Sequence, residues 1–156
     1  MTRPAANTSV SCLPTPRPVT DQDAQRLFDL ASEKLSAAAT PPGNRKPFGA
    51  LRAEPEYVRT NATKWTSGFF AAELWRMFER THDAKWLIAA RQYTKDLLPV
   101  ARFTSTHDLN FMVGLPTALG ERLDPAPKRR AAYQRARLTA ARTLDLRWNP
   151  NVKALK

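Results

Sequence analysis

The chain has 156 residues, a length that suits one domain or a piece of a larger one. Apolar residues make up 42% of it and only 5 glycines are present, a composition that favours packed helices over a sheet. The single Cys12 excludes an internal disulfide framework and a cysteine metal site, and the sequence has no run of ~18 apolar residues that could span a membrane.

The net charge of +11 is concentrated in the last quarter of the chain. Residues 122–156 hold ten Lys/Arg and two Asp, a net charge of +8. This segment could bind nucleic acid or another anionic ligand, or it could be a solvated helix face. Few aromatic residues lie among the basic ones and no nucleic-acid motif accompanies them, so we favour the solvated face and expect no nucleic-acid partner.

Residues 1–19 are predicted to be a disordered leader, because four prolines (Pro4, Pro14, Pro16 and Pro18) prevent a regular helix there. They lack the apolar segment of a secretory signal. The sequence leaves the cellular compartment open, with the cytoplasm as the default. Residues 20–156 are predicted to form one helical domain.

The first predicted helix runs from Asp21 to Ala38, with Thr20 as N-cap. Apolar residues recur in it at helical spacing: Leu27, Leu30, Ala31 and Leu35. A long irregular connection, Thr40 to Thr63, is predicted to follow, because prolines interrupt it.

The second and third helices are predicted to pack as an antiparallel hairpin, because only a few residues link them. The second runs from Lys64 to Arg80, capped by Thr66 or Ser67. Its apolar face is formed by Phe70, Leu74, Met77 and Phe78. The third begins after Asp83 and is closed by Pro99. Its buried residues are expected to include Trp86, Leu87, Ala90, Leu97 and Leu98.

The fourth helix is predicted from Asp108 to Gly120, with Pro116 kinking or shortening it and Gly120 at the C′ position. The fifth runs from Lys128 to Leu146. It has a thin apolar stripe of Tyr133, Ala136, Ala140 and Leu144. Helices joined alternately by long and short loops indicate an all-α array of helical hairpins.

Several kinds of site are not predicted. The sequence has no glycine-rich phosphate loop and no nucleophile elbow, and nothing in it implies a cofactor. The two histidines, His82 and His107, fall on different predicted elements, so no metal site is predicted. His82 is interpreted as an exposed turn residue.

Trp65 and Asp108 each stand at the start of a predicted helix. In a barrel of helical hairpins the starts of alternate helices gather at one end, where an aromatic wall and a carboxylate would suit a sugar. The alternative makes Asp108 an N-cap and Trp65 a core anchor.

Three short stretches resemble the unsaturated glucuronyl hydrolases of glycoside hydrolase family 88. Trp65-Thr66-Ser67-Gly68-Phe69-Phe70 resembles that family's Trp-(Thr/Cys)-(Ser/Asp)-Gly-Phe-(Phe/Trp) segment. The stretch from Thr106 to Met112, Thr-His-Asp-Leu-Asn-Phe-Met, is similar to its His-Asp-Leu-Gly-Phe-Met segment. Arg147-Trp148-Asn149-Pro150-Asn151-Val152 resembles its Arg-(Phe/Tyr)-Asn-Pro-x-Val stretch. The likeness covers roughly residues 48–156.

The resemblance implies an (α/α)6 barrel that hydrates the C4–C5 double bond of an unsaturated glucuronide oligosaccharide. It implies that Asp108 is one of two active-site aspartates, that Trp65 faces the substrate and that His107 lies beside the aspartate. Asn110 and Ala71-Ala72 depart from the family's pattern. The second aspartate corresponds to a point beyond Lys156. We therefore expect a partial (α/α)6 barrel that is catalytically incomplete.

Two other interpretations remain open. The chain could be a non-enzymatic basic helical binding module, or a degenerate product that does not fold stably. Salt-dependent retention on nucleic acid would indicate the first, and uncooperative thermal unfolding the second.

Overall fold

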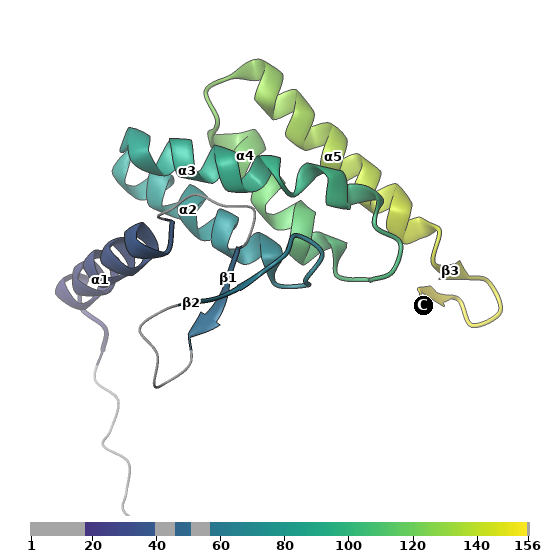
Figure 1. The fold of residues 1–156 in the computed structure, drawn as a ribbon, viewed down its shortest axis with the longest axis horizontal. Helices are drawn as coiled ribbons and strands as arrows, with labels where there is room; N and C mark the ends of the chain where they lie inside the picture. The colour runs from purple at the N-terminus through teal and green to yellow at the C-terminus, as the bar shows by residue number, and fades with distance from the viewer. Residues whose placement is uncertain (1–17, 40–45, 51–56, 156) are drawn as a thin grey trace, which may run out of the picture.

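The computed structural model describes residues 18–39, 46–50 and 57–155. In these ranges the chain forms five α-helices and two small β-hairpins (Figure 1). The α-helices are α1 Asp21–Ala39, α2 Ser67–Thr81, α3 Ala84–Lys95, α4 Leu115–Leu123 and α5 Pro127–Asp145. A 3-10 helix, η1 (Leu98–Arg102), follows α3, and a π-helix, η2 (Asn110–Gly114), leads into α4. The predicted all-α array of helical hairpins is confirmed.

Helix α1 begins where the sequence predicts. The Thr20 hydroxyl accepts a hydrogen bond from the Asp23 N–H at 3.2 Å, and the Asp23 carboxylate accepts one from the Thr20 N–H at 2.9 Å. This reciprocal pair satisfies two backbone donors that the helix start would otherwise leave open. The predicted leader lies, as far as residue 17, outside the described residues.

Helix α1 packs against the rest of the chain through Phe28 and Leu35, while Leu27 and Leu30 on its predicted apolar face are 63% and 52% exposed. The Arg80 guanidinium lies 4.6 Å from the centre of the Phe28 ring, in cation–π contact. Helix α1 lies at the edge of the molecule (Figure 1). Spacing alone therefore identified the helix and the packing of Leu35, but it wrongly placed Leu27 and Leu30 on the packed face and missed Phe28.

The prediction of an irregular connection from Thr40 to Thr63 is wrong where the structure describes it. Strands β1 (Lys46–Ala50) and β2 (Tyr57–Thr60) pair antiparallel. Their register shifts between Pro47 and Gly49, as at a β-bulge, which accommodates a proline within a two-stranded ladder.

Helix α2 starts at Ser67, directly after Thr66, one of the two predicted N-cap residues, so Lys64 and Trp65 lie before it. The Asn61 side chain accepts hydrogen bonds from both the N–H and the hydroxyl of Thr63, and the Ser67 N–H donates to the Lys64 carbonyl, so residues 61–66 form turns. Neither predicted capping hydroxyl acts as a cap. Thr66, at the N-cap position, makes no side-chain capping bond, and the Ser67 hydroxyl donates to the Ala62 carbonyl.

Helix α3 confirms its predicted cap, because the Asp83 carboxylate accepts from the Lys85 N–H at 2.9 Å. The helix ends at Lys95, so the prediction that Pro99 closes it is wrong. Pro99 lies in the first turn of η1, where the N–H that proline lacks would have no partner within the helix. His82 is exposed, as predicted, and ends α2 in the left-handed region at φ 55°.

The fourth predicted helix contains two helix types. Its first turns form η2, in which the Leu115 N–H donates to the Asn110 carbonyl, five residues back. Pro116 then lies in the first turn of α4. Gly120 is not the C′ residue: it lies within α4, where a Cβ would be 2.8 Å from the Tyr133 ring. Close packing of α4 on α5 therefore explains this glycine.

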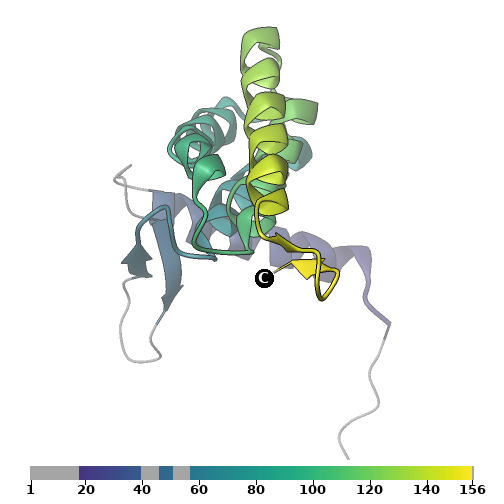
Figure 2. The same ribbon diagram turned by 90° about the vertical axis from the view of Figure 1, so that its right-hand side faces the viewer.

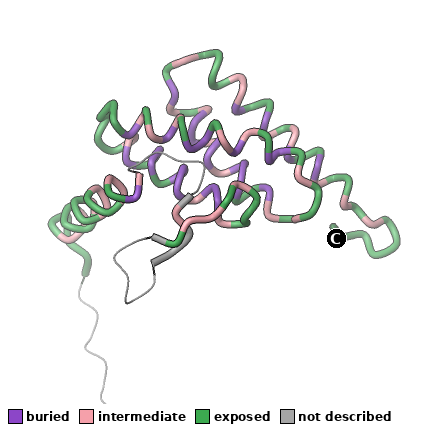
Figure 3. Tube along the Cα trace, viewed as in Figure 1, coloured by how far each residue is buried: buried purple, intermediate pink, exposed green. Residues whose placement is uncertain are grey.

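The core lies between α2, α3, α4 and α5, and Figure 3 shows the buried positions gathered where these helices face one another. Trp75 is fully buried at its centre, and its indole N–H donates to the Thr94 hydroxyl at 2.9 Å. A second cluster, which includes Leu109, Met112 and Ala136, packs η1 and η2 against α5.

The fifth helix confirms its predicted stripe: Tyr133, Ala136 and Ala140 are buried, and Leu144 is partly buried against the same cluster as Ala136 and Ala140. Past α5 the chain forms the short antiparallel hairpin of β3 (Trp148–Asn149) and β4 (Ala154–Leu155), which projects from the helical body (Figure 2). No helix in the described ranges is long and apolar enough to cross a membrane.

Candidate functional site

Asp108 lies in a turn just before η2, with its side chain 21% exposed. The Thr106 hydroxyl accepts a hydrogen bond from the Asp108 N–H at 3.0 Å and donates one to the Asp108 carboxylate at 2.9 Å. His107 Nε2 lies 3.4 Å from the other carboxylate oxygen, and the imidazole is 73% exposed. The turn therefore holds the carboxylate in one orientation at the surface.

Capping does not account for the Asp108 side chain. The Asp108 carbonyl accepts the first hydrogen bonds of the following helix, from the N–H groups of Phe111 and Met112. Within the described part of the chain, neither partner of the carboxylate is a backbone N–H of that helix. The Thr106 hydroxyl thus holds the carboxylate from the side of the turn, and the His107 imidazole lies beside it.

Trp65 lies in the turn before α2 and forms an aromatic trio with Phe69 and Phe111. The centre of its ring lies 6.1 Å from that of Phe69 and 6.4 Å from that of Phe111, both in edge-on contact. The rings of Phe69 and Phe111 stack, with their centres 5.6 Å apart and an angle of 27° between their planes. Trp65 is 47% and Phe111 42% exposed. The interpretation of Trp65 as a core anchor is therefore wrong, because half of its surface remains open to solvent.

A close backbone contact joins the aromatic trio to the Asp108 turn. A Cβ built on Gly68 would lie 2.0 Å from the carbonyl oxygen of Phe111 and 2.6 Å from that of Met112. Only glycine lets α2 approach η2 this closely. Since Phe111 lies three residues after Asp108, this contact places Trp65 and Phe69 beside the helix start that carries the carboxylate.

The π-helix helps to make this contact possible. Pro116 has no N–H to donate to Met112, four residues earlier, and this is one of the two carbonyls that approach Gly68. The wide turn instead bonds Leu115 to Asn110. π-Turns within helices are frequent at functional sites. The irregular helix therefore presents backbone to α2 and the Asp108 turn to solvent.

Sequence reasoning singled out Trp65, His107 and Asp108 as candidate site residues but did not predict the contacts made by Thr106, Gly68 and the two phenylalanines. The four-residue spacing of Trp65 and Phe69 at a helix start was a usable signal, since such residues lie on one face. The Thr-x-Asp spacing of Thr106 and Asp108 was another, since a hydroxyl so placed can bond the backbone two residues on.

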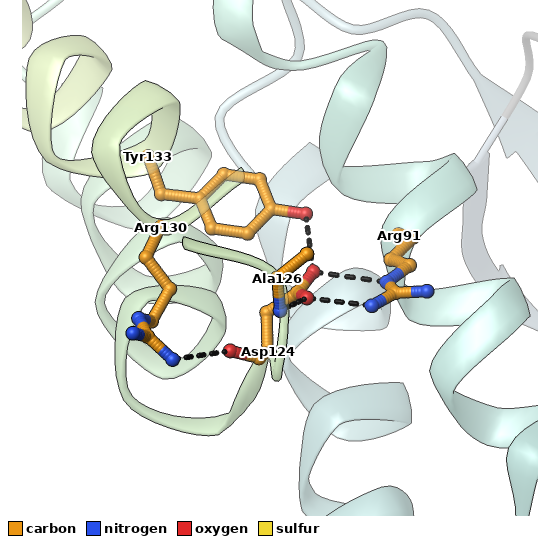
Figure 4. A network of polar contacts seen from close by, with 5 residues as sticks. All are labelled: Arg91, Asp124, Ala126, Arg130 and Tyr133. Carbon is orange, nitrogen blue, oxygen red and sulfur yellow. Dashed lines mark hydrogen bonds and ion pairs between the residues drawn. The ribbon is translucent and has the colours of Figure 1, made fainter. Parts of the chain in front are cut away.

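The network around Asp124 is a second polar cluster, and it is internal (Figure 4). The Asp124 side chain has no exposed surface; its carboxylate accepts two hydrogen bonds from Arg91, at 2.6 and 2.9 Å, and one from the Ala126 N–H. Tyr133 donates to it at 3.4 Å, and Arg130 donates to its backbone carbonyl. Burial raises the pKa of the Tyr133 phenol to about 12, with the Asp124 charge adding to the effect. The cluster ties α3 to the α4–α5 connection, and its central carboxylate, Asp124, offers no surface to a ligand.

The Asp108 turn and the aromatic trio together form the candidate site. Exposed aromatic faces bind the apolar faces of sugar rings, and a carboxylate beside them can accept hydrogen bonds from hydroxyls or transfer a proton. Among the described residues no group of three or more His, Cys, Asp or Glu side chains could hold a metal ion.

A comparison with known proteins finds a relative by sequence. The chain is 32% identical over 108 residues to an unsaturated glucuronyl hydrolase of Formosa agariphila, a match that covers 69% of this chain and 26% of that protein. No family model matches the chain.

Solved structures share the fold. The unsaturated glucuronyl hydrolase of Streptococcus agalactiae matches with a TM-score of 0.74 and 22% identity, covering 86% of this chain and 34% of that one. An unsaturated glucuronyl hydrolase specific for heparin matches with a TM-score of 0.76 and 24% identity, covering 87% of this chain and 36% of that one. A variant of the streptococcal enzyme with an aspartate replaced by asparagine matches with a TM-score of 0.73 and 21% identity, covering 85% of this chain and 36% of that one.

These matches confirm the resemblance drawn from the three motifs and the partial α/α-barrel fold. The chain spans about a quarter of the length of the relative matched by sequence, and about a third of the solved structures.

Proposed function

We propose that this chain carries part of the active site of an enzyme that hydrates the C4–C5 double bond of unsaturated glucuronyl oligosaccharides. Asp108 serves as a general acid and base, Trp65 contacts the sugar and His107 lies beside the carboxylate. The observation that supports this most is the contact at Gly68, which places the exposed aromatic trio next to the Asp108 turn.

The chemistry needs a group that can both give and take a proton. In hydration of a vinyl ether, a proton adds to C4 and the oxygen of water adds to C5 as that water loses a proton. A carboxylate held by Thr106 at one oxygen and approached by His107 at the other is oriented for such general acid–base work. This reaction differs from ordinary glycoside hydrolysis, in which two carboxylates flank an oxocarbenium-like centre.

The aromatic trio suits the sugar. A pyranose ring presents C–H groups on its faces, which pack against aromatic surface, while its hydroxyls need polar partners at the edge. Trp65 and Phe111 supply exposed aromatic surface, and Asp108 and His107, in the turn just before η2, supply polar groups. The proposed substrate class is therefore an oligosaccharide that ends in an unsaturated uronate.

We favour this function over a basic binding module because basic groups of α5 are engaged within the chain. Arg137 pairs with Glu121 at 2.6 Å, and Arg130 donates to the Asp124 carbonyl at 3.2 Å. Retention on nucleic acid that falls steeply with salt, and is lost when Arg129 and Arg135 are neutralised, would favour the module instead.

Binding and turnover test the proposal separately. The purified chain should bind an unsaturated glucuronyl disaccharide weakly, detected by amide shift changes at residues 65–69 and 106–112. Trp65→Ala should remove those changes. Leu138→Ala, on the exposed side of α5, is the control and should preserve them.

Turnover is followed as loss of the double-bond absorbance. We expect little or none from the 156-residue chain, which spans about a third of the matched enzymes, and rapid loss of absorbance would contradict that expectation. In any longer active form that contains this chain, Asp108→Asn should abolish turnover and leave thermal unfolding unchanged. Retained turnover in that variant would rule out the role given to Asp108.

A further inference from the structure

The segment that leads into the Asp108 turn is tied to the end of α5 at two carbonyl groups. The Thr143 hydroxyl donates to the Ala101 carbonyl at 2.7 Å. The guanidinium of Arg147 donates through Nη1 to the Thr104 carbonyl, also at 2.7 Å. The donors are four residues apart, one helical turn, so they face the same strip of chain.

The end of α5 is built to present Arg147 in this way. The helix ends at Asp145, but the Leu146 N–H still donates to the Arg142 carbonyl and the Arg147 N–H to the Leu144 carbonyl. These hydrogen bonds extend the helical turn by two residues past Asp145, which places Arg147 beside the loop that follows η1. Figures 1 and 2 both show that loop passing the C-terminal end of α5.

The tie at Thr104 acts on a segment with little other regular structure. Residues 103–108 lie between η1 and η2, and Thr104 and Ser105 are exposed. Thr106 comes two residues after the tied carbonyl, and its hydroxyl bonds both the Asp108 N–H and the Asp108 carboxylate. A short series of contacts therefore runs from Arg147 through Thr104 and Thr106 to the carboxylate.

We propose that Arg147, supported by Thr143, is a positioning residue for Asp108. By holding the Thr104 carbonyl, the guanidinium fixes the path of the turn and with it the orientation of the Thr106 hydroxyl. A hydrogen bond donated by a charged group to a carbonyl at the surface of a loop is stronger than a neutral one, which suits it to this task. The inference rests on the function proposed for Asp108, since positioning matters only where that carboxylate reacts.

Lysine and alanine at position 147 separate the hydrogen bond from the rest of the side chain. Arg147→Lys keeps a positive charge and a donor within reach of Thr104, whereas Arg147→Ala removes both. Thr143→Val removes the second donor and keeps the shape. Arg142→Ala is the matched control, because Arg142 is an exposed arginine of α5, five residues before Arg147, and the substitution removes the same charge.

Amide hydrogen exchange tests the positioning directly in the intact chain. The Asp108 amide, which donates to Thr106, should exchange about tenfold faster in Arg147→Ala and severalfold faster in Thr143→Val. It should stay within about twofold of wild type in Arg147→Lys and Arg142→Ala. The Trp86 amide at the start of α3 should not change in any variant. Equal Asp108 exchange rates in Arg147→Ala and Arg142→Ala would overturn the proposal.

Sugar binding supplies the readout that a merely structural arginine would leave unchanged. With an unsaturated glucuronyl disaccharide as probe, Arg147→Ala should bind about fivefold to tenfold more weakly than wild type, and Arg147→Lys should recover most of the loss. If Arg147→Ala, Trp65→Ala and Asp108→Asn all leave disaccharide binding unchanged, the proposed function fails. The exchange rate of the Asp108 amide then still shows whether Arg147 positions the turn. If those two variants lose binding while Arg147→Ala keeps it, only the positioning role is overturned.

Discussion

Replacing Gly68 by alanine tests the contact on which the candidate site depends. The added Cβ would lie 2.0 Å from the Phe111 oxygen, 2.6 Å from the Met112 oxygen and 2.9 Å from the Met112 carbonyl carbon. All three are backbone atoms, which cannot rotate away as a side-chain tip can. The starts of α2 and η2 must therefore move apart by about 1 Å or more to restore ordinary contact distances.

The free energy of unfolding should fall by about 2–3 kcal/mol. Overpacking a well-packed site typically costs about 1–3 kcal/mol, and backbone obstacles place Gly68 at the upper end. The helix propensity of alanine offsets this by less than about 1 kcal/mol, because the residue lies in the first turn of α2. In a domain of this size each kcal/mol shifts the unfolding midpoint by about 2–4 °C, so we expect a loss of about 5–10 °C.

Gly114→Ala is the matched control for this measurement. The obstacle there is the side-chain oxygen of Asn110, at 2.3 Å from the added Cβ, and Asn110 is exposed and free to change rotamer. The control should cost less than about 1 kcal/mol. Thermal unfolding by circular dichroism compares the two variants with wild type. A Gly68→Ala midpoint within 2 °C of the Gly114→Ala midpoint would refute the close approach of α2 to η2.

The remaining predictions concern buried polar groups. Asp124→Ala should lower the free energy of unfolding by about 3 kcal/mol, measured by urea unfolding at neutral pH, because it leaves the Arg91 guanidinium without its buried partner. Burial alone would raise the pKa of Asp124, but the Arg91 hydrogen bonds hold that pKa below its usual value. The resulting stability is present above about pH 4 and lost as the pH falls through the depressed pKa, so the urea midpoint should fall more steeply with acid in wild type than in Asp124→Ala. The Tyr133 phenol should titrate near pH 12 by ultraviolet absorbance. Its raised pKa contributes stability that is complete below about pH 10 and lost as the pH rises towards 12, and Tyr133→Phe should lack this alkaline loss. Thr94→Val should cost about 1–3 kcal/mol by stranding the buried Trp75 N–H, while Thr94→Ser should restore most of it.

Local signals in the sequence predicted the helices but not how they are combined. Thr20 and Asp83 fixed the starts of α1 and α3, because caps act on the residues beside them. The β1–β2 hairpin was missed, since short strands containing Pro47 and Gly49 show no clear alternation. The end of α4 was misplaced because Gly120 is set by the Tyr133 ring, a contact that spacing along the chain cannot reveal.

The candidate site was predictable in parts for the same reason. Trp65 and Asp108 stood out because each lies at the start of a predicted helix, and their proximity was expected because the starts of alternate helices gather at one end of a barrel of hairpins. The exposed surface of Trp65, which decides against a core role, depends on tertiary packing. The role of Gly68 could not be derived either, because the Phe111 carbonyl that requires it lies more than forty residues away.

That contact gives a physical reason why the two motifs occur in one chain. The Trp65 motif needs Gly68 because the Phe111 and Met112 carbonyl oxygens of η2 lie too close to leave room for a side chain. The Met112 carbonyl is turned towards Gly68 because Pro116, four residues later, has no N–H to donate to it. Each motif is therefore the complement of the other. A change that restores a regular helix at η2, such as Pro116→Ala, should draw the Met112 carbonyl back into the helix and loosen the trio, even though Pro116 belongs to neither motif. Weaker stacking of Phe111 on Phe69 in that variant, seen as faster ring rotation by NMR, would establish the dependence; unchanged rotation would show that the π-turn has another cause.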